Sequence, residues 1–119
     1  MTENPKRILH VEDDMSVQKY ISTLISDMAV VTSAQTLKDA KSRVKEIHYD
    51  LIIIDFTLPD GSGSELIAQL AKQDPSIPII VFSAHEIANT MLNVKQTFLK
   101  NRYSPKIFLD TISKYLGNN

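Results

Sequence analysis

LIIIDFTLPDGSG, at residues 51–63, contains the strongest fold signal in this chain. It opens with four large aliphatic residues, a run that is typical of a strand buried on both faces of a sheet. The run ends on the carboxylate of Asp55, and the proline and glycines that follow end regular structure. A buried carboxylate is costly unless a partner offsets its charge. The stretch therefore predicts a central strand whose end carries either a paired acid or a reactive one.

The composition of the chain indicates one soluble globular domain. Its 119 residues are 43% hydrophobic and 23% charged, the formal net charge is −1, and there is no cysteine. Without a basic surplus we expect no direct nucleic-acid partner, and without cysteine there are no disulfides and no thiol chemistry. No apolar run approaches the roughly 20 residues of a membrane span, so we expect no membrane contact and a cytoplasmic location.

Short apolar runs alternate with amphipathic stretches along the chain. The predicted strands are 8–11, 29–34, 51–54, 79–83 and 97–100. The predicted helices have apolar faces formed by Val17, Ile21, Leu24, Ile25 and Met28; by Leu37, Ala40, Val44 and Ile47; by Leu66, Ile67, Leu70 and Ala71; by Ile87, Met91 and Val94; and by Ile107, Phe108, Ile112 and Tyr115. Such alternation predicts a parallel sheet with helices on both faces and right-handed crossovers.

Several helix ends are marked by capping residues. Thr36 with Asp39 is a capping box, and Ser104 precedes a proline that suits the first helical position. Asp14 is interpreted as a helix N-cap rather than as a third metal-site acid, and Gly117 can cap the last helix.

Polar residues stand at the expected carboxyl ends of four strands. Glu12 and Asp13 follow the first strand, Asp55 follows the third, and Ser83 and Lys100 end the fourth and fifth. In an open α/β sheet these ends form the ligand site, so the side chains should converge. Two carboxylates about 4 Å apart repel by roughly 4 kcal/mol at an effective dielectric of about 20. A hard divalent cation with oxygen ligands would offset that repulsion, and Mg²⁺ suits such a site best.

The same residue types suit phosphoryl transfer, in which cations neutralise the moving group and a carboxylate can be the covalent acceptor. Asp55 is the best acceptor candidate because it ends a strand and leads into an open loop. Glu12 and Asp13 are better placed as metal ligands, and the backbone carbonyl of Thr57 can complete the metal shell. Lys100 would supply a second positive charge.

Four segments together resemble the receiver domain of two-component response regulators: ILHVEDD, LIIIDFTLPDGSG, PIIVFSA and TFLK. Each segment alone is a weak signal, but four in order at matching strand ends form a specific set. The resemblance extends from Lys6 to Leu116 and implies a single receiver domain over 1–119 with its core at 6–116. It also implies a flavodoxin-like, doubly wound sheet of five parallel strands in the order 2-1-3-4-5, with five helices.

The resemblance also implies a function for the residues at the strand ends. Asp55 takes the place of the phosphoacceptor, Glu12 and Asp13 that of the acidic metal pair, Ser83 that of the hydroxyl that follows the phosphoryl group, and Lys100 that of its cationic partner. The expected cofactor is Mg²⁺, and the expected donor is a sensor histidine kinase or a histidine phosphotransfer protein. The expected output is control of a downstream protein or output domain. Beyond self-catalysed phosphoryl transfer and autodephosphorylation, no enzyme activity is expected.

Two features depart from the family pattern. Ser83 and Lys100 are closer together than in most receivers, so we expect a fourth helix that is shortened or irregular. Thr97 stands where many receivers carry an aromatic residue, and Phe98 beside it should point to the opposite face of the strand. Both features put the usual output face in question.

Two other functions remain open at this point. A phosphohydrolase of the haloacid-dehalogenase type also uses a strand-end aspartate, but it needs a second aspartate where Thr57 stands. A pseudo-receiver would keep the fold as an interaction module without phosphorylation. The three histidines, His10, His48 and His85, have no metal-ligand spacing and are interpreted as structural.

Overall fold

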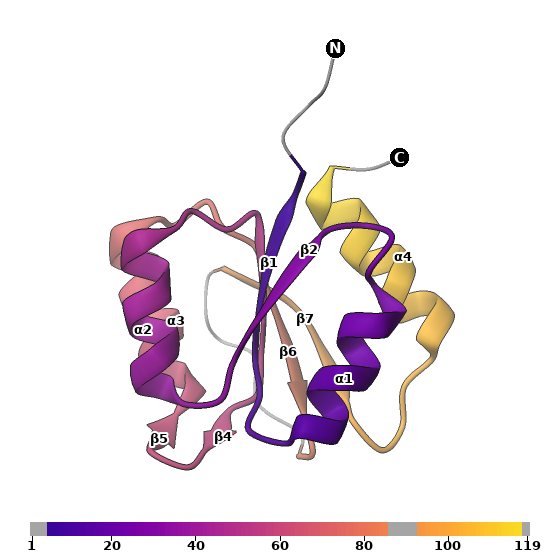
Figure 1. The fold of residues 1–119 in the computed structure, drawn as a ribbon, viewed down its shortest axis with the longest axis horizontal. Coiled ribbons are helices and arrows are strands. Elements are labelled where there is room, and N and C mark those ends of the chain that lie inside the picture. Colours follow the sequence, from indigo (N-terminus) through magenta and orange to yellow (C-terminus); the bar gives the residue numbers. More distant parts are fainter. Residues whose placement is uncertain (1–4, 86–92, 118–119) are drawn as a thin grey trace.

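Five parallel strands form the central sheet of the computed structural model, which describes residues 5–85 and 93–117. Along the sheet the order is β2-β1-β3-β6-β7 (Figure 1). These strands are β1 (Arg7–Val11), β2 (Val30–Ala34), β3 (Leu51–Ile54), β6 (Ile79–Ser83) and β7 (Val94–Leu99). Numbered within the sheet alone, this order is 2-1-3-4-5, which confirms the predicted topology.

Helices cover both faces of the sheet, with α2 and α3 on one side and α1 and α4 on the other (Figure 1). The helices are α1 (Met15–Leu24), α2 (Leu37–Glu46), α3 (Gly63–Gln73) and α4 (Pro105–Leu116). Alternate residues of the strands face opposite layers. Ile52 and Ile54 therefore join the core under α2 and α3, while Leu51 and Ile53 join the core under α1 and α4.

The predicted helix ends are confirmed. The side chain of Asp14 accepts hydrogen bonds from the backbone N–H groups of Ser16 and Val17, so this acid is the N-cap of α1. Thr36 caps α2 and Ser104 caps α4 by the same kind of bond. Gly117 ends α4 in the left-handed conformation, at φ 82°, which is readily accessible to glycine.

The last two strands differ in part from the sequence prediction. Val94 was predicted to belong to a helix, but it is buried and begins β7, where it pairs with Ile79. The fifth strand therefore starts three residues before its predicted start at Thr97 and ends at Leu99, before Lys100. The rest of the predicted fourth helix, including Ile87 and Met91, lies outside the described residues.

Some residues predicted to form apolar helix faces are not part of the core. Ile107 is 58% exposed, whereas Phe108, Ile112 and Leu116 form the buried stripe of α4 at the i, i+4, i+8 spacing. Ala71 is also exposed. The predicted loop after Asp55 contains a short antiparallel hairpin, made of β4 (Thr57–Leu58) and β5 (Gly61–Ser62).

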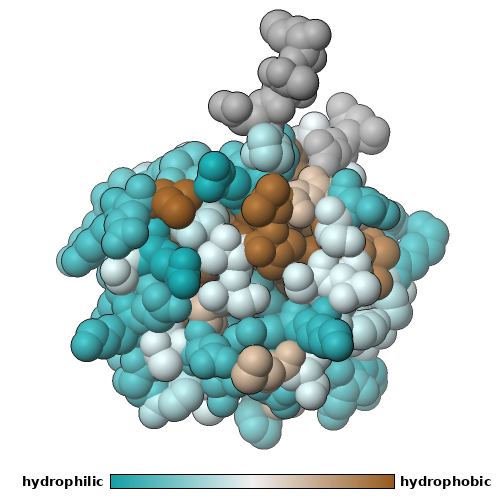
Figure 2. Space-filling model, viewed as in Figure 1, coloured by the Kyte–Doolittle hydropathy of each residue, from teal (hydrophilic) through white to brown (hydrophobic). Residues whose placement is uncertain are grey.

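The surface of the molecule is largely hydrophilic on the face shown in Figure 2. The large hydrophobic side chains that are exposed among the described residues are Met15, Tyr20, Val30 and Ile107. Within the part of the chain that the structure describes, no helix has the length and apolar character needed to cross a membrane.

Truncating Phe108 should strongly destabilise the fold, because its fully buried ring packs against three other aromatic rings. The ring centroids of Phe82, Phe98 and Tyr103 lie 5.4, 5.2 and 5.6 Å from that of Phe108. We expect Phe108→Ala to lower the free energy of unfolding by about 3–5 kcal/mol, measured by urea denaturation. The matched control, Ile107→Ala on the same helix, should stay within about 0.5 kcal/mol of the wild type. Equal losses in the two variants would contradict this packing.

Candidate functional site

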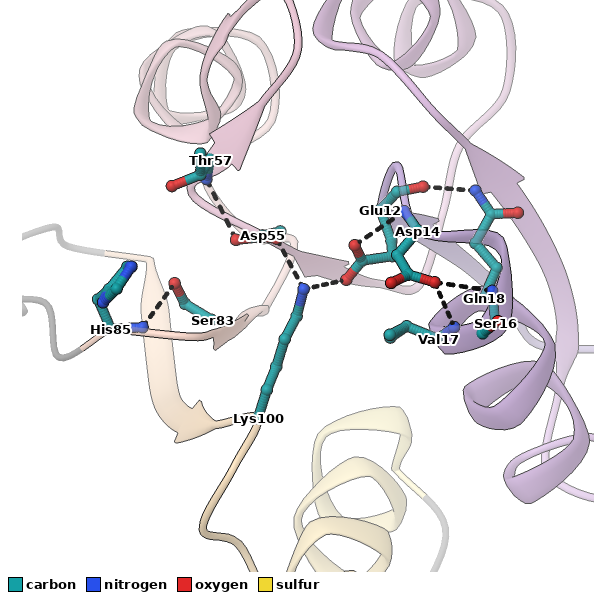
Figure 3. A network of polar contacts seen from close by, with 10 residues as sticks. All are labelled: Glu12, Asp14, Ser16, Val17, Gln18, Asp55, Thr57, Ser83, His85 and Lys100. Carbon is teal, nitrogen blue, oxygen red and sulfur yellow. Dashed lines mark hydrogen bonds and ion pairs between the residues drawn. The ribbon is translucent and has the colours of Figure 1, made fainter.

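Backbone hydrogen bonds between neighbouring strand ends bring the predicted site residues together. Asp55 N–H donates to the carbonyl of Val11 at 3.0 Å, which places Asp55 beside the residue that follows β1, Glu12. On the other side of the site, Lys100 N–H donates to the carbonyl of Ser83 at 2.8 Å. The parallel register of the sheet thus fixes the ends of four strands at one edge (Figure 3).

Three carboxylates meet at this edge. Ligand oxygens of Glu12, Asp13 and Asp55 lie within 4.8 Å of one another. Glu12 and Asp55 are buried, at 1% and 6% exposure, whereas Asp13 is exposed. An all-oxygen group of this size and charge fits a hard divalent cation, which usually keeps several waters and takes one or two carboxylates from a protein.

The ammonium of Lys100 lies between two of these carboxylates. Its Nζ is 2.6 Å from Glu12 Oε1 and 2.8 Å from Asp55 Oδ2 (Figure 3). Burial alone would lower the pKa of Lys100, but the hydrogen bonds to Asp55 and Glu12 outweigh burial and raise it. Lys100 is therefore firmly cationic at this site and offsets part of the carboxylate repulsion.

Glu12 is held by hydrogen bonds from two residues that follow it, Asp14 and Gln18, in addition to Lys100. Burial raises the pKa of its carboxyl group above the usual value, against the opposing effects of Lys100 and of the Asp14 N–H. That N–H donates to Glu12 Oε2 at 3.1 Å, and the side-chain amide of Gln18 donates to the Glu12 carbonyl. The carboxylate therefore has a fixed position, at the cost of desolvation that a bound cation would reduce.

Both carboxylate oxygens of Asp55 have a partner, and the largely buried side chain borders a surface cavity. The backbone N–H of Thr57 donates to Asp55 Oδ1 at 3.1 Å (Figure 3). A Cβ on Gly63 would lie 2.5 Å from the Asp55 carbonyl oxygen, so only glycine permits this close approach of the loop. A cavity of about 320 Å³, lined by Asp13, Asp55, Thr57 and neighbouring residues, gives access to the carboxylate.

Ser83 is buried at 2% exposure and lines a second cavity, of about 350 Å³, together with Thr57 and His85. Among the described residues, its Oγ accepts one long contact of 3.5 Å, from the His85 N–H (Figure 3). All five predicted side chains thus gather at one edge of the sheet, together with the backbone of Thr57. The roles assigned to them, including the metal contact of the Thr57 carbonyl, stay predictions.

Sequence reasoning gave no functional weight to His10, a buried histidine next to this site. His10 is 1% exposed, and its Nδ1 has no hydrogen-bond partner among the described residues. Burial, followed by the positive charge of Lys100, lowers its pKa to about 4, although the charge of Asp55 acts in the opposite direction. A polar residue inside the otherwise apolar strand ILHV was the available signal.

His10 should make the stability of the protein pH-dependent in metal-free buffer. Between pH 6.5 and 4 the unfolded state binds a proton that folded His10 does not, so stability falls as the pH falls. At about 1.4 kcal/mol per pKa unit, the loss approaches about 3 kcal/mol. His10→Leu should remove this component. In urea unfolding, the variant should therefore lose about 3 kcal/mol less free energy of unfolding than the wild type when the pH is lowered from 7 to 4.

Ile53, a buried residue of β3 that pairs with His10 and has no titratable group, provides the control for this pH effect. Ile53→Val should lower the free energy of unfolding by about 0.5–1.5 kcal/mol, and by the same amount at pH 7 and pH 4. A difference between wild type and His10→Leu that is the same at both pH values would contradict the assignment.

Comparisons with known proteins agree with the fold and with the geometry of the site. The family model of the response regulator receiver domain matches residues 8–101. The two-component response regulator PhoP of Pseudomonas aeruginosa is 35% identical over 79 residues, which cover 66% of this chain and 35% of PhoP. The chemotaxis protein CheY of Listeria monocytogenes is 32% identical over 80 residues, which cover 66% of this chain and 67% of CheY. The match to PhoP therefore spans about a third of that protein's length.

Solved structures share the fold over nearly the whole chain. A CheY-like receiver domain protein from Methanospirillum hungatei superimposes with a TM-score of 0.88 at 22% identity, covering 96% of this chain and 95% of that one. The receiver domain of HemR from Leptospira biflexa gives a TM-score of 0.84 at 26% identity, covering 96% of both chains. The group of Glu12, Asp13 and Asp55 fits the phosphoacceptor site of such domains. The chain therefore belongs to the response regulator receiver domain family of two-component signalling.

Proposed function

We propose that this chain is a phosphorylation switch in which Asp55 accepts a phosphoryl group from a phosphohistidine in the presence of Mg²⁺. The observation that carries the proposal is the convergence of Glu12, Asp13 and Asp55 around one point, with Lys100 in contact with two of them. Asp55 is the acceptor because it faces a solvent-accessible cavity from the end of the central strand β3.

In the transfer step, a carboxylate oxygen of Asp55 forms a bond to phosphorus as the P–N bond of the phosphohistidine breaks. The imidazole nitrogen leaves with the bonding electron pair and takes up a proton. When bound, Mg²⁺ would neutralise oxygens of the moving group, and Glu12, Asp13, Asp55 and the Thr57 carbonyl would hold it. Water later attacks the phosphorus of the aspartyl phosphate, releasing inorganic phosphate and restoring the Asp55 carboxylate.

Lys100 changes partners in this scheme. In the structure its ammonium bonds both Glu12 and Asp55. A cation at the acidic group would take over the charge compensation of Glu12, and Lys100 would then pair with an oxygen of the phosphoryl group. The buried hydroxyl of Ser83, which accepts a long contact from the His85 N–H, would be a second donor for the phosphoryl oxygens. These two movements would convert phosphorylation into a conformational change.

The wider setting of the switch is also a proposal. The donor is a sensor histidine kinase or a histidine phosphotransfer protein, and the output is a downstream protein or an output domain. The names of the relatives, which include two-component response regulators and a chemotaxis protein, support this setting. We further propose that residues 1–119 form one receiver domain with its core at 6–116, that it acts in the cytoplasm, and that its chemistry is limited to self-catalysed phosphorylation and dephosphorylation.

The alternatives have weaker support. A haloacid-dehalogenase-like phosphohydrolase needs a general acid two residues after the nucleophile, and Thr57 cannot supply one. A pseudo-receiver without phosphorylation would have no need of three converging acids and a lysine, because such a group is costly to keep unless it binds something. Both alternatives predict a different outcome in the following experiment.

Phosphorylation of Asp55 can be followed by intact-protein mass spectrometry. With Mg²⁺ and acetyl phosphate, the wild-type chain should gain one phosphoryl group, which is lost on standing because the acyl phosphate hydrolyses. Asp55→Asn should gain none, and omission of Mg²⁺ should prevent the modification. A hydrolase would instead consume acetyl phosphate with continuous turnover, and a pseudo-receiver would neither be modified nor consume the donor.

The matched control for this experiment is Asp14→Asn. Asp14 lies next to the acidic group but caps α1, and asparagine caps helices equally well. This variant should be phosphorylated like the wild type. Equal modification of Asp55→Asn and wild type would place the acceptor elsewhere and refute the proposal.

Mg²⁺ should stabilise the folded chain by mass action, because the ligands converge only in the folded state. At a concentration 100 times the dissociation constant, the gain is about 2.7 kcal/mol in the free energy of unfolding. Asp13→Asn should lose most of this gain, since Asp13 is the exposed acid of the group and the substitution removes its charge. Urea denaturation with and without Mg²⁺ measures this stabilisation. An unchanged stabilisation in Asp13→Asn would exclude Asp13 as a ligand.

A further inference from the structure

The hairpin that follows Asp55 also caps the neighbouring helix α2. Asp60, at the turn between β4 and β5, accepts hydrogen bonds from the backbone N–H groups of Leu37 at 2.8 Å and Lys38 at 2.9 Å. Figure 1 shows the hairpin at the same end of the molecule as the start of α2. The first N–H groups of a helix have no partner inside the helix, and the N-cap Thr36 serves only that of Asp39. The first turn of α2 thus depends on a residue from the phosphoacceptor loop.

The other end of the hairpin is tied to the phosphoacceptor. The Thr57 N–H, at the start of β4, donates to Asp55 Oδ1 at 3.1 Å. Asp60 follows Thr57 by only three positions and lies in the turn that joins β4 to β5, and these two strands pair with each other. One short, hydrogen-bonded unit therefore contacts the Asp55 carboxylate at one end and the helix start at the other.

The hairpin is packed too closely to move independently of its neighbours. A Cβ on Gly61 would lie 2.9 Å from Leu37 Cδ2, and a Cβ on Gly63 would lie 2.5 Å from the Asp55 carbonyl oxygen. Leu37 itself is buried in the core under α2 and α3. Displacement of β4 is therefore transmitted to the Leu37 side chain as well as to Asp60, because closely packed groups have few intermediate positions.

The bonds at Asp60 are of the kind that can open while the core stays folded. Asp60 is exposed, so its hydrogen bonds to the helix compete with water, and openings of this type need far less free energy than global unfolding. The N–H groups of Lys38 and Leu37 hold the pKa of Asp60 below its usual range, so its carboxylate stays ionised as an acceptor at neutral pH.

We propose that the β4–β5 hairpin couples the Asp55 site to the first turn of α2, with Asp60 as the connecting residue. This inference rests on the proposed phosphorylation of Asp55. A phosphoryl group on Asp55 would change the hydrogen bond that the Thr57 N–H makes to this residue, and a cation would bind the Thr57 carbonyl, so both act at the start of β4 and displace Asp60 with that strand. The strength of the hydrogen bonds from the Leu37 and Lys38 amides to Asp60 then depends on whether Asp55 is phosphorylated.

The coupling would also change the molecular surface. A shallow depression of about 410 Å³ lies across the junction and is lined by residues of α2, of the hairpin turn and of α3: Leu37, Lys38, Lys41, Ser42, Lys45, Asp60 and Glu65. Lys41 and Glu65 form an ion pair across it at 3.2 Å. A change at Asp60 alters the shape and charge of this depression, so a protein bound there would distinguish the two states.

Amide hydrogen exchange measured by NMR on the full chain tests the coupling. In the wild type, addition of Mg²⁺ and acetyl phosphate should change the exchange rates of the Leu37 and Lys38 amides by about fivefold or more, the low end of typical allosteric couplings. In Asp60→Ala, both amides should exchange rapidly in either state. Thr36→Ala is the matched control, because it removes a cap from the same helix end without touching the hairpin. It should speed exchange at Asp39 but preserve the state-dependent difference at Leu37 and Lys38.

Coupling between two sites is reciprocal for binding, so the same variants should differ in their Mg²⁺ affinity. We expect Asp60→Ala to shift the Mg²⁺ dissociation constant by about fivefold and Thr36→Ala to leave it unchanged. Asp60→Asn, which keeps one carbonyl oxygen as acceptor, should give an intermediate shift and guards against a folding defect in the alanine variant.

Intact mass measured on the NMR samples separates the two possible failures. In one case the wild type is phosphorylated, but the Leu37 and Lys38 amides exchange equally in both states and Asp60→Ala binds Mg²⁺ like the wild type. Asp60 is then a helix cap only, and the coupling is refuted. If the wild type gains no phosphoryl group, the proposed function itself fails, and the coupling fails with it.

Discussion

The ion pairs of Lys100 hold the functional edge of this protein together. Its ammonium lies 2.6 Å from a carboxylate oxygen of Glu12 and 2.8 Å from one of Asp55, and both acids are buried. Two unpaired carboxylates about 4 Å apart would repel by roughly 4 kcal/mol at an effective dielectric of about 20. That is a large share of the 5–15 kcal/mol by which small domains are typically stable, so the acids can converge in the folded chain only with a cation between them.

The position of Lys100 follows from the sheet rather than from the acids. Its backbone N–H donates to the Ser83 carbonyl at the end of the parallel pair β6 and β7, and two strands, β3 and β6, separate β7 from β1. The position of Lys100 at the same edge of the sheet as the acids could be predicted from the sequence. Apolar runs that alternate with amphipathic helices indicate parallel strands, and the carboxyl ends of such strands meet at one edge. The convergence of Glu12, Asp13 and Asp55 was predictable for the same reason. What the pattern could not provide was the geometry in which the lysine serves two acids at once.

The features that sequence reasoning missed depend on contacts between distant segments or on small rotations of a helix. Asp60 caps a helix that begins more than twenty positions earlier, and nothing local to its Pro-Asp-Gly turn indicates that contact. Ile107 and Phe108 are equally apolar, but one residue corresponds to about 100° around a helix, so only Phe108 faces the core. His10 was interpreted as structural, and its lowered pKa comes first from burial and then from the charge of Lys100, which is distant in sequence.

The same contacts offer a route by which the proposed switch would transmit its state. Thr97 occupies the position at which many receivers carry an aromatic side chain, and a threonine cannot fill or vacate the volume of a ring. The neighbouring Phe98 offers no substitute, because its ring is packed against that of Phe108, with centroids 5.2 Å apart, in the core under α1 and α4. The loop after Asp55, by contrast, is joined to the site covalently and reaches the first turn of α2 within five positions. Because this loop is short and closely packed at both ends, a displacement at Asp55 has few ways to be absorbed before it reaches α2. If Asp55 is phosphorylated as we propose, the α2 face is the most direct place for a partner to sense that change.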